Sequence, residues 1–108
     1  MQFNEYEKLA MRTANTKATK DMKLANFGMG LSGEAGEVTD YLKKVVFHGH
    51  ELDKQKLKDE LGDVLWYIAT IANIAGIELN NIAEYNVEKL KKRYPNGFEK
   101  EKSINRKV

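Results

Sequence analysis

The sequence of 108 residues predicts an all-α protein, and three observations support this class. Its single proline is Pro95, so residues 1–94 contain no residue that obliges a helix to end. Apolar residues recur every three or four positions over long stretches, which is the period of one helix face. Strand signals are weak, because β-branched runs are few and the Asn96-Gly97 pair directly follows the proline instead of joining two alternating segments.

The first two helices are predicted over residues 4–13 and 21–47, with a polar link over residues 14–20. The apolar side of the first helix is short: Tyr6, Leu9 and Ala10. The second helix has a longer apolar stripe: Leu24, Phe27, Leu31, Ala35, Val38, Leu42 and Val45. The sequence HGH at positions 48–50 is expected to end this helix.

The third helix is predicted over residues 53–75, with Asp53 as its N-cap and Gly76 at its C-terminal end. Its apolar positions follow the same spacing: Leu57, Leu61, Val64, Leu65, Ile68, Ile71 and Ala72. The fourth helix is predicted to begin near residue 80 or 81 and to run to Tyr94, where Pro95 stops it.

Two long helices and two shorter ones, joined by short links, predict a four-helix bundle-type protomer. We expect residues 1–98 to form one domain and residues 99–108 to form a mobile tail. The third helix carries an apolar surface wider than one stripe, which extends through Ile68, Ile71, Ile74 and Ile77. A thin monomeric bundle cannot cover that surface, so a homodimer is expected, and a dimer of dimers is also consistent with it.

Composition excludes several classes of function. The sequence has no cysteine, which removes disulfides, thiolate metal sites and cysteine nucleophiles. It has no apolar run long enough to span a membrane and no secretory signal, so we expect a cytoplasmic protein without a membrane partner. The net charge of +2 is too small to argue for a nucleic-acid partner. The charge is uneven, with net −2 over residues 1–83 and net +4 over residues 84–108.

Two pairs of acids suggest a metal site. Glu34 and Glu37 lie on the second helix, and Glu60 and Asp63 lie on the third. The i, i+3 spacing places each pair on one helix face, and the intervening residues allow the two helices to run antiparallel with the pairs opposed. Four carboxylates would repel one another unless cations lay between them, and they suit a hard cation such as Mg²⁺ or Mn²⁺. Ordinary surface acids are the competing interpretation.

Glycines near the first acid pair indicate a close approach. Each glycine inside a helix costs about 1 kcal/mol relative to alanine. Gly28, Ser32 and Gly36 share one face, where another backbone or a ligand could come close, and Gly33 lies one turn before Glu37. Because Glu37 neighbours that open position, we expect it to act as the general base, although Glu34 could exchange roles with it.

The fourth helix carries a basic face. Asn86, Lys89 and Arg93 are spaced i, i+3, i+7. Lys89 and Arg93 could hold phosphate oxygens, and Asn86 could orient a phosphate or a sugar hydroxyl. A solvated helix end that complements the helix dipole is the alternative explanation. Opposite an acidic metal site, the basic face would complete a polyphosphate site.

These motifs resemble the MazG-like nucleoside triphosphate pyrophosphohydrolase family, part of the all-α nucleotide pyrophosphatase superfamily. Three segments within residues 23–98 carry the resemblance: GLSGEAGEV, KDELGDVLWYIATIA and NVEKLKKRYPNGF. The family signature is E-x-x-E followed by E-x-x-D. The resemblance implies Mg²⁺-dependent hydrolysis of a nucleoside triphosphate to a monophosphate and pyrophosphate, in a dimer or a dimer of dimers, as in nucleotide-pool control or house-cleaning.

The resemblance also implies residue roles. It makes Glu34, Glu37, Glu60 and Asp63 metal ligands, and it aligns Asn86, Lys89 and Arg93 with the N-x-x-K-x-x-x-R pattern that faces the phosphates. Tyr67 and Asn26 match positions near the nucleotide pocket. Two alternatives remain open: a related helical pyrophosphatase that acts on phosphoribosyl-ATP, and a non-enzymatic helical interaction module whose acids are merely exposed.

Overall fold

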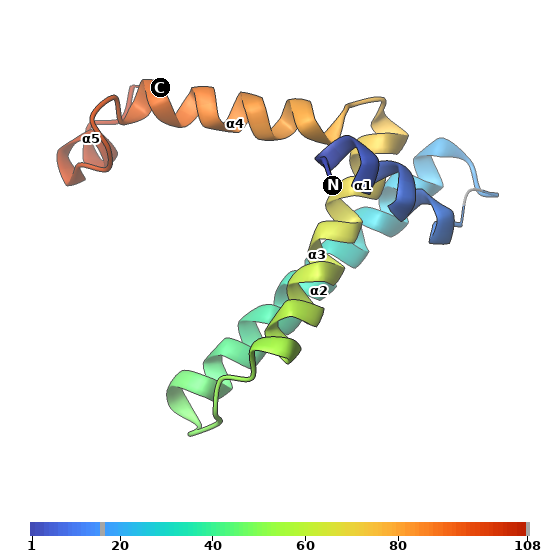
Figure 1. Ribbon diagram of the computed structural model, residues 1–108, viewed down its shortest axis with the longest axis horizontal. Helices are drawn as coiled ribbons and strands as arrows, with labels where there is room; N and C mark the ends of the chain where they lie inside the picture. Colours follow the sequence, from blue (N-terminus) through green and yellow to red (C-terminus); the bar gives the residue numbers. More distant parts are fainter. Residues whose placement is uncertain (16, 108) are drawn as a thin grey trace.

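The computed structural model of the chain describes residues 1–15 and 17–107, and these contain helices and turns but no β-strand (Figure 1). The elements follow in order: α1 Phe3–Ala10, a 3₁₀ turn Met11–Thr13, α2 Lys20–Phe47, α3 Lys54–Ala75, α4 Leu79–Arg93 and α5 Lys100–Ile104. The all-α class is confirmed, and the four predicted helices are present. Their ends lie within one or two residues of those expected, except that α1 already ends at Ala10 and the 3₁₀ turn Met11–Thr13 completes the predicted range. The predicted link over residues 14–20 includes Thr16, which lies outside the described residues.

The helix ends follow the local chemistry that the sequence indicates. The Asp53 carboxylate caps α3 by accepting hydrogen bonds from the backbone N–H groups of Gln55 and Lys56, at 3.0 and 3.3 Å. Gly76 ends α3 in the left-handed conformation, with φ of 77°. Thr19 caps α2 by accepting from the N–H of Met22.

Helices α2 and α3 pack antiparallel and form the long hairpin of the molecule (Figure 1). Tyr41, which is buried, closes the turn between them. Its hydroxyl accepts a hydrogen bond from the backbone N–H of Asp53 at 2.7 Å and donates to the carbonyl of Glu51 at 3.3 Å. The Lys56 ammonium lies over the Tyr41 ring, 4.8 Å from its centroid. The loop end of the hairpin is therefore fixed by one buried side chain.

The N-terminal helix α1 fixes the junction between α3 and α4. The buried Glu7 carboxylate accepts hydrogen bonds from the backbone N–H of Leu79 at 2.6 Å and from the Asn73 side-chain amide at 3.0 Å. The Asn4 side chain accepts from the backbone N–H of Asn80 at 3.0 Å. Both backbone donors belong to the first turn of α4, where a helix has no partners of its own. Helix α1 therefore caps α4 from a distant part of the sequence.

The core lies at this junction. Ala10, Ala69 and Leu79 are buried together, and Tyr6, Trp66 and Ile68 pack against them. The Trp66 indole N–H lies within hydrogen-bonding distance of the Ala10 carbonyl, at 3.1 Å, and of the Thr13 hydroxyl, at 2.9 Å. Trp66 therefore holds α1 against α3.

Helix α4 leaves the hairpin at the junction and runs away from it (Figure 1). The radius of gyration is 16.9 Å, whereas a compact chain of this length has about 13 Å. The described residues thus do not close a four-helix bundle within one protomer, in contrast to the sequence-based expectation. The reason is that α4 packs on α1 and α3 at the junction instead of returning along the hairpin.

The C-terminal segment contains the short helix α5. The expectation that residues 99–108 are mobile stays a prediction, and Val108 lies outside the described residues. Across the described part of the chain, the helices are too short or too polar to cross a membrane.

Candidate functional site

The candidate site lies between the two helices of the hairpin. Glu34 of α2 and Glu60 and Asp63 of α3 each present a carboxylate oxygen, and these oxygens all lie within 4.8 Å of one another. Glu34 and Glu60 are half-buried, and Asp63 is exposed. The antiparallel packing of α2 and α3 produces this convergence, because it sets the two i, i+3 pairs opposite each other. We call these three residues the acid cluster.

The acid cluster is electrostatically strained without a cation. Loss of solvent around Glu34, followed by the negative charges of Asp63, Glu60 and Glu37, raises the pKa of the Glu34 carboxyl above its ordinary value. Each neighbouring carboxylate disfavours ionisation of Glu34, so a bound cation would relieve a repulsion that the fold itself creates.

The fourth predicted ligand, Glu37, lies one turn along α2 from Glu34 and outside the group of three. It is exposed, and its charge acts on Glu34 and also helps to raise the pKa of Lys44, whose main partner is Asp40. Lys44 and Asp40 form an ion pair at 2.9 Å. Glu37 therefore stands between the acid cluster and this ion pair.

The donor set fits a hard divalent cation. Magnesium–oxygen bonds measure about 2.0–2.1 Å, so ligands on opposite sides of the ion lie about 4 Å apart. The separation of at most 4.8 Å within the acid cluster is compatible with that geometry after a small adjustment of the side chains. Carboxylate oxygens alone favour Mg²⁺ or Mn²⁺ over softer metals.

An aromatic group adjoins the acid cluster on the side of α1. The Tyr67 ring lies 5.0 Å from the Trp66 ring and 6.2 Å from the Phe27 ring. Tyr67 also packs directly against Gly30, where a Cβ atom would collide with the ring. The close approach is therefore made at Gly30, whereas added Cβ atoms at Gly28, Gly33 and Gly36 would meet nothing within 4 Å. The expected Gly28–Ser32–Gly36 face is open in this structure.

The remaining predicted residues are placed apart from the acid cluster. Asn26 is exposed on α2, two turns before Glu34. Asn86, Lys89 and Arg93 lie on α4, which carries them away from the hairpin (Figure 1). Arg93, at the far end of α4, lines a hollow formed with the C-terminal segment.

Two residues of α1 whose contacts matter for the site or for the position of α4 were not identified from the sequence. Tyr6 of α1 lies close enough to Asp63 that this carboxylate, after burial, contributes to raising the pKa of the tyrosine. Glu7 orients α4, as described above. No spacing rule could have indicated either one, because α1 is separated from its partners by more than 50 residues of sequence.

The hairpin and its acid cluster define an all-helical protein with a candidate site for a divalent cation. The chain belongs to the MazG nucleotide pyrophosphohydrolase domain family, whose model matches residues 24–98. That range contains both acid pairs and all of α4, whereas α1 and α5 lie outside it. Membership supports a nucleotide pyrophosphohydrolase activity of a general kind.

A relative is a "Gene 37 protein" of Mycobacterium phage L5, which is 38% identical over 73 residues. The matched part covers 64% of this chain and 64% of the phage protein, so the chain spans less than two thirds of that relative's length. No solved structure matched the chain.

Proposed function

We propose that the chain hydrolyses a nucleoside triphosphate, with ribose or deoxyribose, to the monophosphate and pyrophosphate in a Mg²⁺-dependent reaction. Mn²⁺ is the expected substitute. The observation that carries the proposal is the convergence of Glu34, Glu60 and Asp63 inside the segment that matches the family. Control of the nucleotide pool is the role that such an activity would serve.

The four acids would have two different roles, cation binding and proton acceptance. Glu34, Glu60 and Asp63 would hold the ion, and Glu37, one turn away, would complete its ligand set or stand beside it. When bound, the cation would supply charge neutralisation for the phosphates and would acidify a nearby water. Glu37 would accept the proton of the water that attacks the α-phosphorus, as the bond to the bridging oxygen breaks and pyrophosphate leaves. The exposure of its side chain to solvent suits that task.

The phosphate-binding and base-binding residues would come from three helices. Lys89 and Arg93 would pair with phosphate oxygens, and Asn86 would orient a phosphate or a sugar hydroxyl. Tyr67 and Asn26 would border the nucleotide on the side of α1. Because α4 diverges from its own hairpin, we infer that Lys89 and Arg93 reach the acid cluster from a second copy of the chain.

Pairing of two copies is supported by apolar surface on the hairpin. A shallow apolar groove follows α3 through Leu57, Leu61 and Leu65. Large apolar side chains on α2 are also exposed, with Val46 at 69% and Phe47 at 78%. Two hairpins packed face to face would form a four-helix arrangement and would cover this surface. A further pairing into a dimer of dimers would be consistent with the same proposal.

The role of the acid cluster can be tested by measuring the hydrolytic activity of the parent protein and of two matched variants. Purified protein should release pyrophosphate from at least one ribo- or deoxyribonucleoside triphosphate, and EDTA should abolish the release. Glu60→Gln should lower kcat by about a hundredfold or more, because it removes one ligand charge and keeps the shape. Asp59→Asn, a charge change at an exposed neighbour on the same helix, should stay within about twofold of the parent.

The reverse outcome would overturn the proposal: full activity of Glu60→Gln, or no turnover of any triphosphate at millimolar Mg²⁺. Phosphoribosyl-ATP belongs in the same panel, because preference for it would select the related pyrophosphatase. Binding to a protein partner without turnover would select the interaction module.

Mixed dimers test whether two copies share a site. Subunits with Glu60→Gln are mixed with subunits carrying Lys89→Ala after reversible dissociation. If the acids and Lys89 of one site come from different copies, half of the dimers gain one intact site, and activity should recover to about a quarter of the parent. Activity that stays at the average of the two variants would show that each copy builds its own site.

A further inference from the structure

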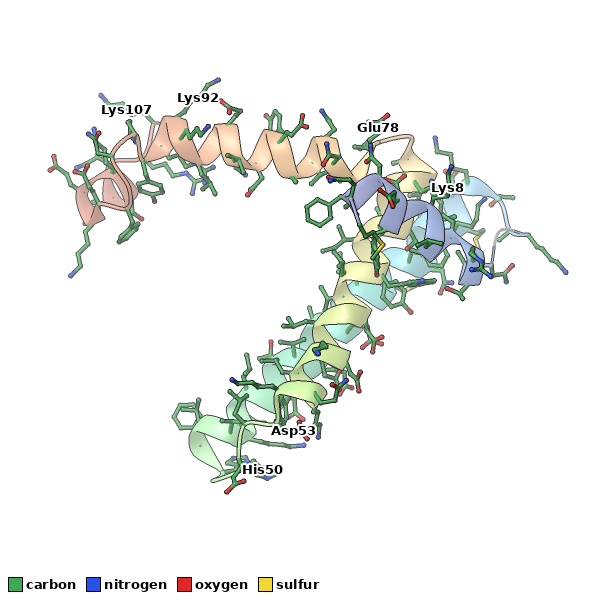
Figure 2. All side chains as sticks on the ribbon, in the orientation of Figure 1. Lys8, His50, Asp53, Glu78, Lys92 and Lys107 are labelled. Atoms are coloured by element: carbon green, nitrogen blue, oxygen red, sulfur yellow. The ribbon has the colours of Figure 1, made fainter. Side chains whose placement is uncertain are left out.

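The C-terminal segment forms a basic hollow with the end of α4. After α5 the chain turns back, so that residues 105–107 lie beside the last turn of α4, and Figure 2 shows Lys92 and Lys107 at the same end of that helix. The hollow has a volume of about 320 Å³. Its lining includes five cationic side chains: Lys92, Arg93, Lys102, Arg106 and Lys107.

The charge of this hollow exceeds what helix capping requires. Cations in the last turn of α4 complement the helix dipole, which accounts for Lys92 and Arg93. Lys102, Arg106 and Lys107 come from the following segment, and one carboxylate, Glu101, lines the hollow with them. Basic side chains gathered around one concavity attract a small anion.

We propose that the hollow binds a compact, multiply charged phosphate anion such as pyrophosphate. Lysine ammonium groups and arginine guanidinium groups are the side chains that pair best with phosphate oxygens, and the Asn105 amide adds a neutral donor to the lining. The concave shape presents these groups toward one volume, which suits a small anion.

An extended nucleic acid fits this surface less well. The basic side chains are gathered at one end of the molecule, and residues 1–83 carry net −2. A long phosphate backbone that extended beyond the hollow would find no net positive charge on residues 1–83 to hold it.

Apart from Arg93, the residues that line the hollow are not among those proposed to hold the cation or the nucleotide. Three of the five cations lie beyond residue 98, where the match to the family ends. Binding there would need no metal, whereas the carboxylates of the acid cluster repel a phosphate anion when no metal is present.

The test is a calorimetric titration of the full chain with pyrophosphate in metal-free buffer containing EDTA. We expect saturable binding that weakens as NaCl is added. Lys102→Glu should raise the Kd by about tenfold or more, since it removes one charge-assisted contact and adds a repulsion. Lys100→Glu is the matched control: it makes the same charge change on the same short helix, outside the lining of the hollow, and should change the Kd by less than about twofold.

Nuclear magnetic resonance can identify the residues that bind pyrophosphate. Changes in backbone amide chemical shifts on adding pyrophosphate should be confined to residues 92–94 and 101–107. Lys102→Gln, which removes charge without reversing it, provides a second variant if the reversal disturbs the segment.

Three results would overturn the proposal: no binding at millimolar pyrophosphate, equal weakening by the Lys102 and Lys100 variants, or binding of a single-stranded oligonucleotide where pyrophosphate does not bind. Because the titration is free of metal and substrate, its failure would leave the proposed hydrolysis unaffected.

Discussion

Glu7 offers a sharp test of how α4 is held. Glu7→Ala removes the acceptor of two hydrogen bonds, from the Leu79 backbone N–H at 2.6 Å and the Asn73 amide at 3.0 Å. Leu79 is 4% exposed, so its N–H would find no water, whereas the exposed Asn73 amide can turn to solvent. A hydrogen bond to a charged group contributes about 1.5–3 kcal/mol, and a buried donor left unpaired costs about 1–3 kcal/mol. We therefore expect a loss of about 2–4 kcal/mol in the free energy of unfolding.

Urea unfolding at fixed protomer concentration measures this loss, because pairing of copies makes apparent stability depend on concentration. Glu7→Gln retains a carbonyl oxygen for the Leu79 N–H, so it should lose less than half as much as Glu7→Ala. Glu5→Ala is the control on the same helix: its exposed carboxylate accepts only a long bond of 3.4 Å from the Gln2 N–H, and its cost should stay below about 1 kcal/mol. Equal costs for the Glu5 and Glu7 alanine variants would refute the capping role.

Two further predictions concern the hairpin. Gly30→Ala should destabilise the fold by about 1–3 kcal/mol because the Tyr67 ring must move, whereas Gly33→Ala, in open space, should stabilise α2 by about 0.5–1 kcal/mol; thermal unfolding of both variants checks the opposite signs. In metal-free protein the raised pKa of Glu34 means that the folded chain binds this proton more tightly than the unfolded chain does. The free energy of unfolding should therefore fall as pH rises above 4.5, the ordinary pKa of a glutamate carboxyl. The free energy of unfolding of the Glu34→Gln variant should fall less steeply with pH. A slope equal to that of the parent protein would contradict the assignment.

Local rules predicted most of the helices. Asp53 and Gly76 supply the cap and the stop at the two ends of α3, and their chemistry acts within one turn, so spacing alone located them. The approach of the two i, i+3 acid pairs could likewise be predicted from the sequence, because helix geometry and one short loop determine whether the pairs meet.

The direction of α4 was not predictable in this way. Helix α4 begins at Leu79 without a side-chain cap from its own N-cap residue, Glu78. The groups that satisfy its first turn belong to Asn4 and Glu7, more than 70 residues earlier in the sequence. The periodicity of apolar residues predicts which face of a helix is buried. It does not predict the direction of the helix axis when a carboxylate from a distant part of the sequence determines that direction. The expectation of a closed bundle failed at this junction.

The glycine that packs tightly within the hairpin could not be singled out from the sequence, for a related reason. The sequence shows four glycines in α2 at similar spacing, and each has equal freedom to admit a neighbour. The rotation of α3 about its axis decides that the Tyr67 ring meets Gly30, and the contact between the Trp66 and Phe27 rings is consistent with that rotation.

Two contacts bracket the acid cluster along the hairpin. On one side, Tyr67 of α3 rests on Gly30 of α2, one turn before Glu34; on the other, Tyr41 of α2 holds the backbone of Asp53, two turns before Glu60. The gap between the helices at the carboxylates is thus a fixed distance, supported at both ends by tyrosines that are not among the candidate ligands of the ion. The preference of the site for cations of different radius should then depend on these tyrosines. A substitution of either tyrosine would change which ion fits, although none of the carboxylates had been substituted.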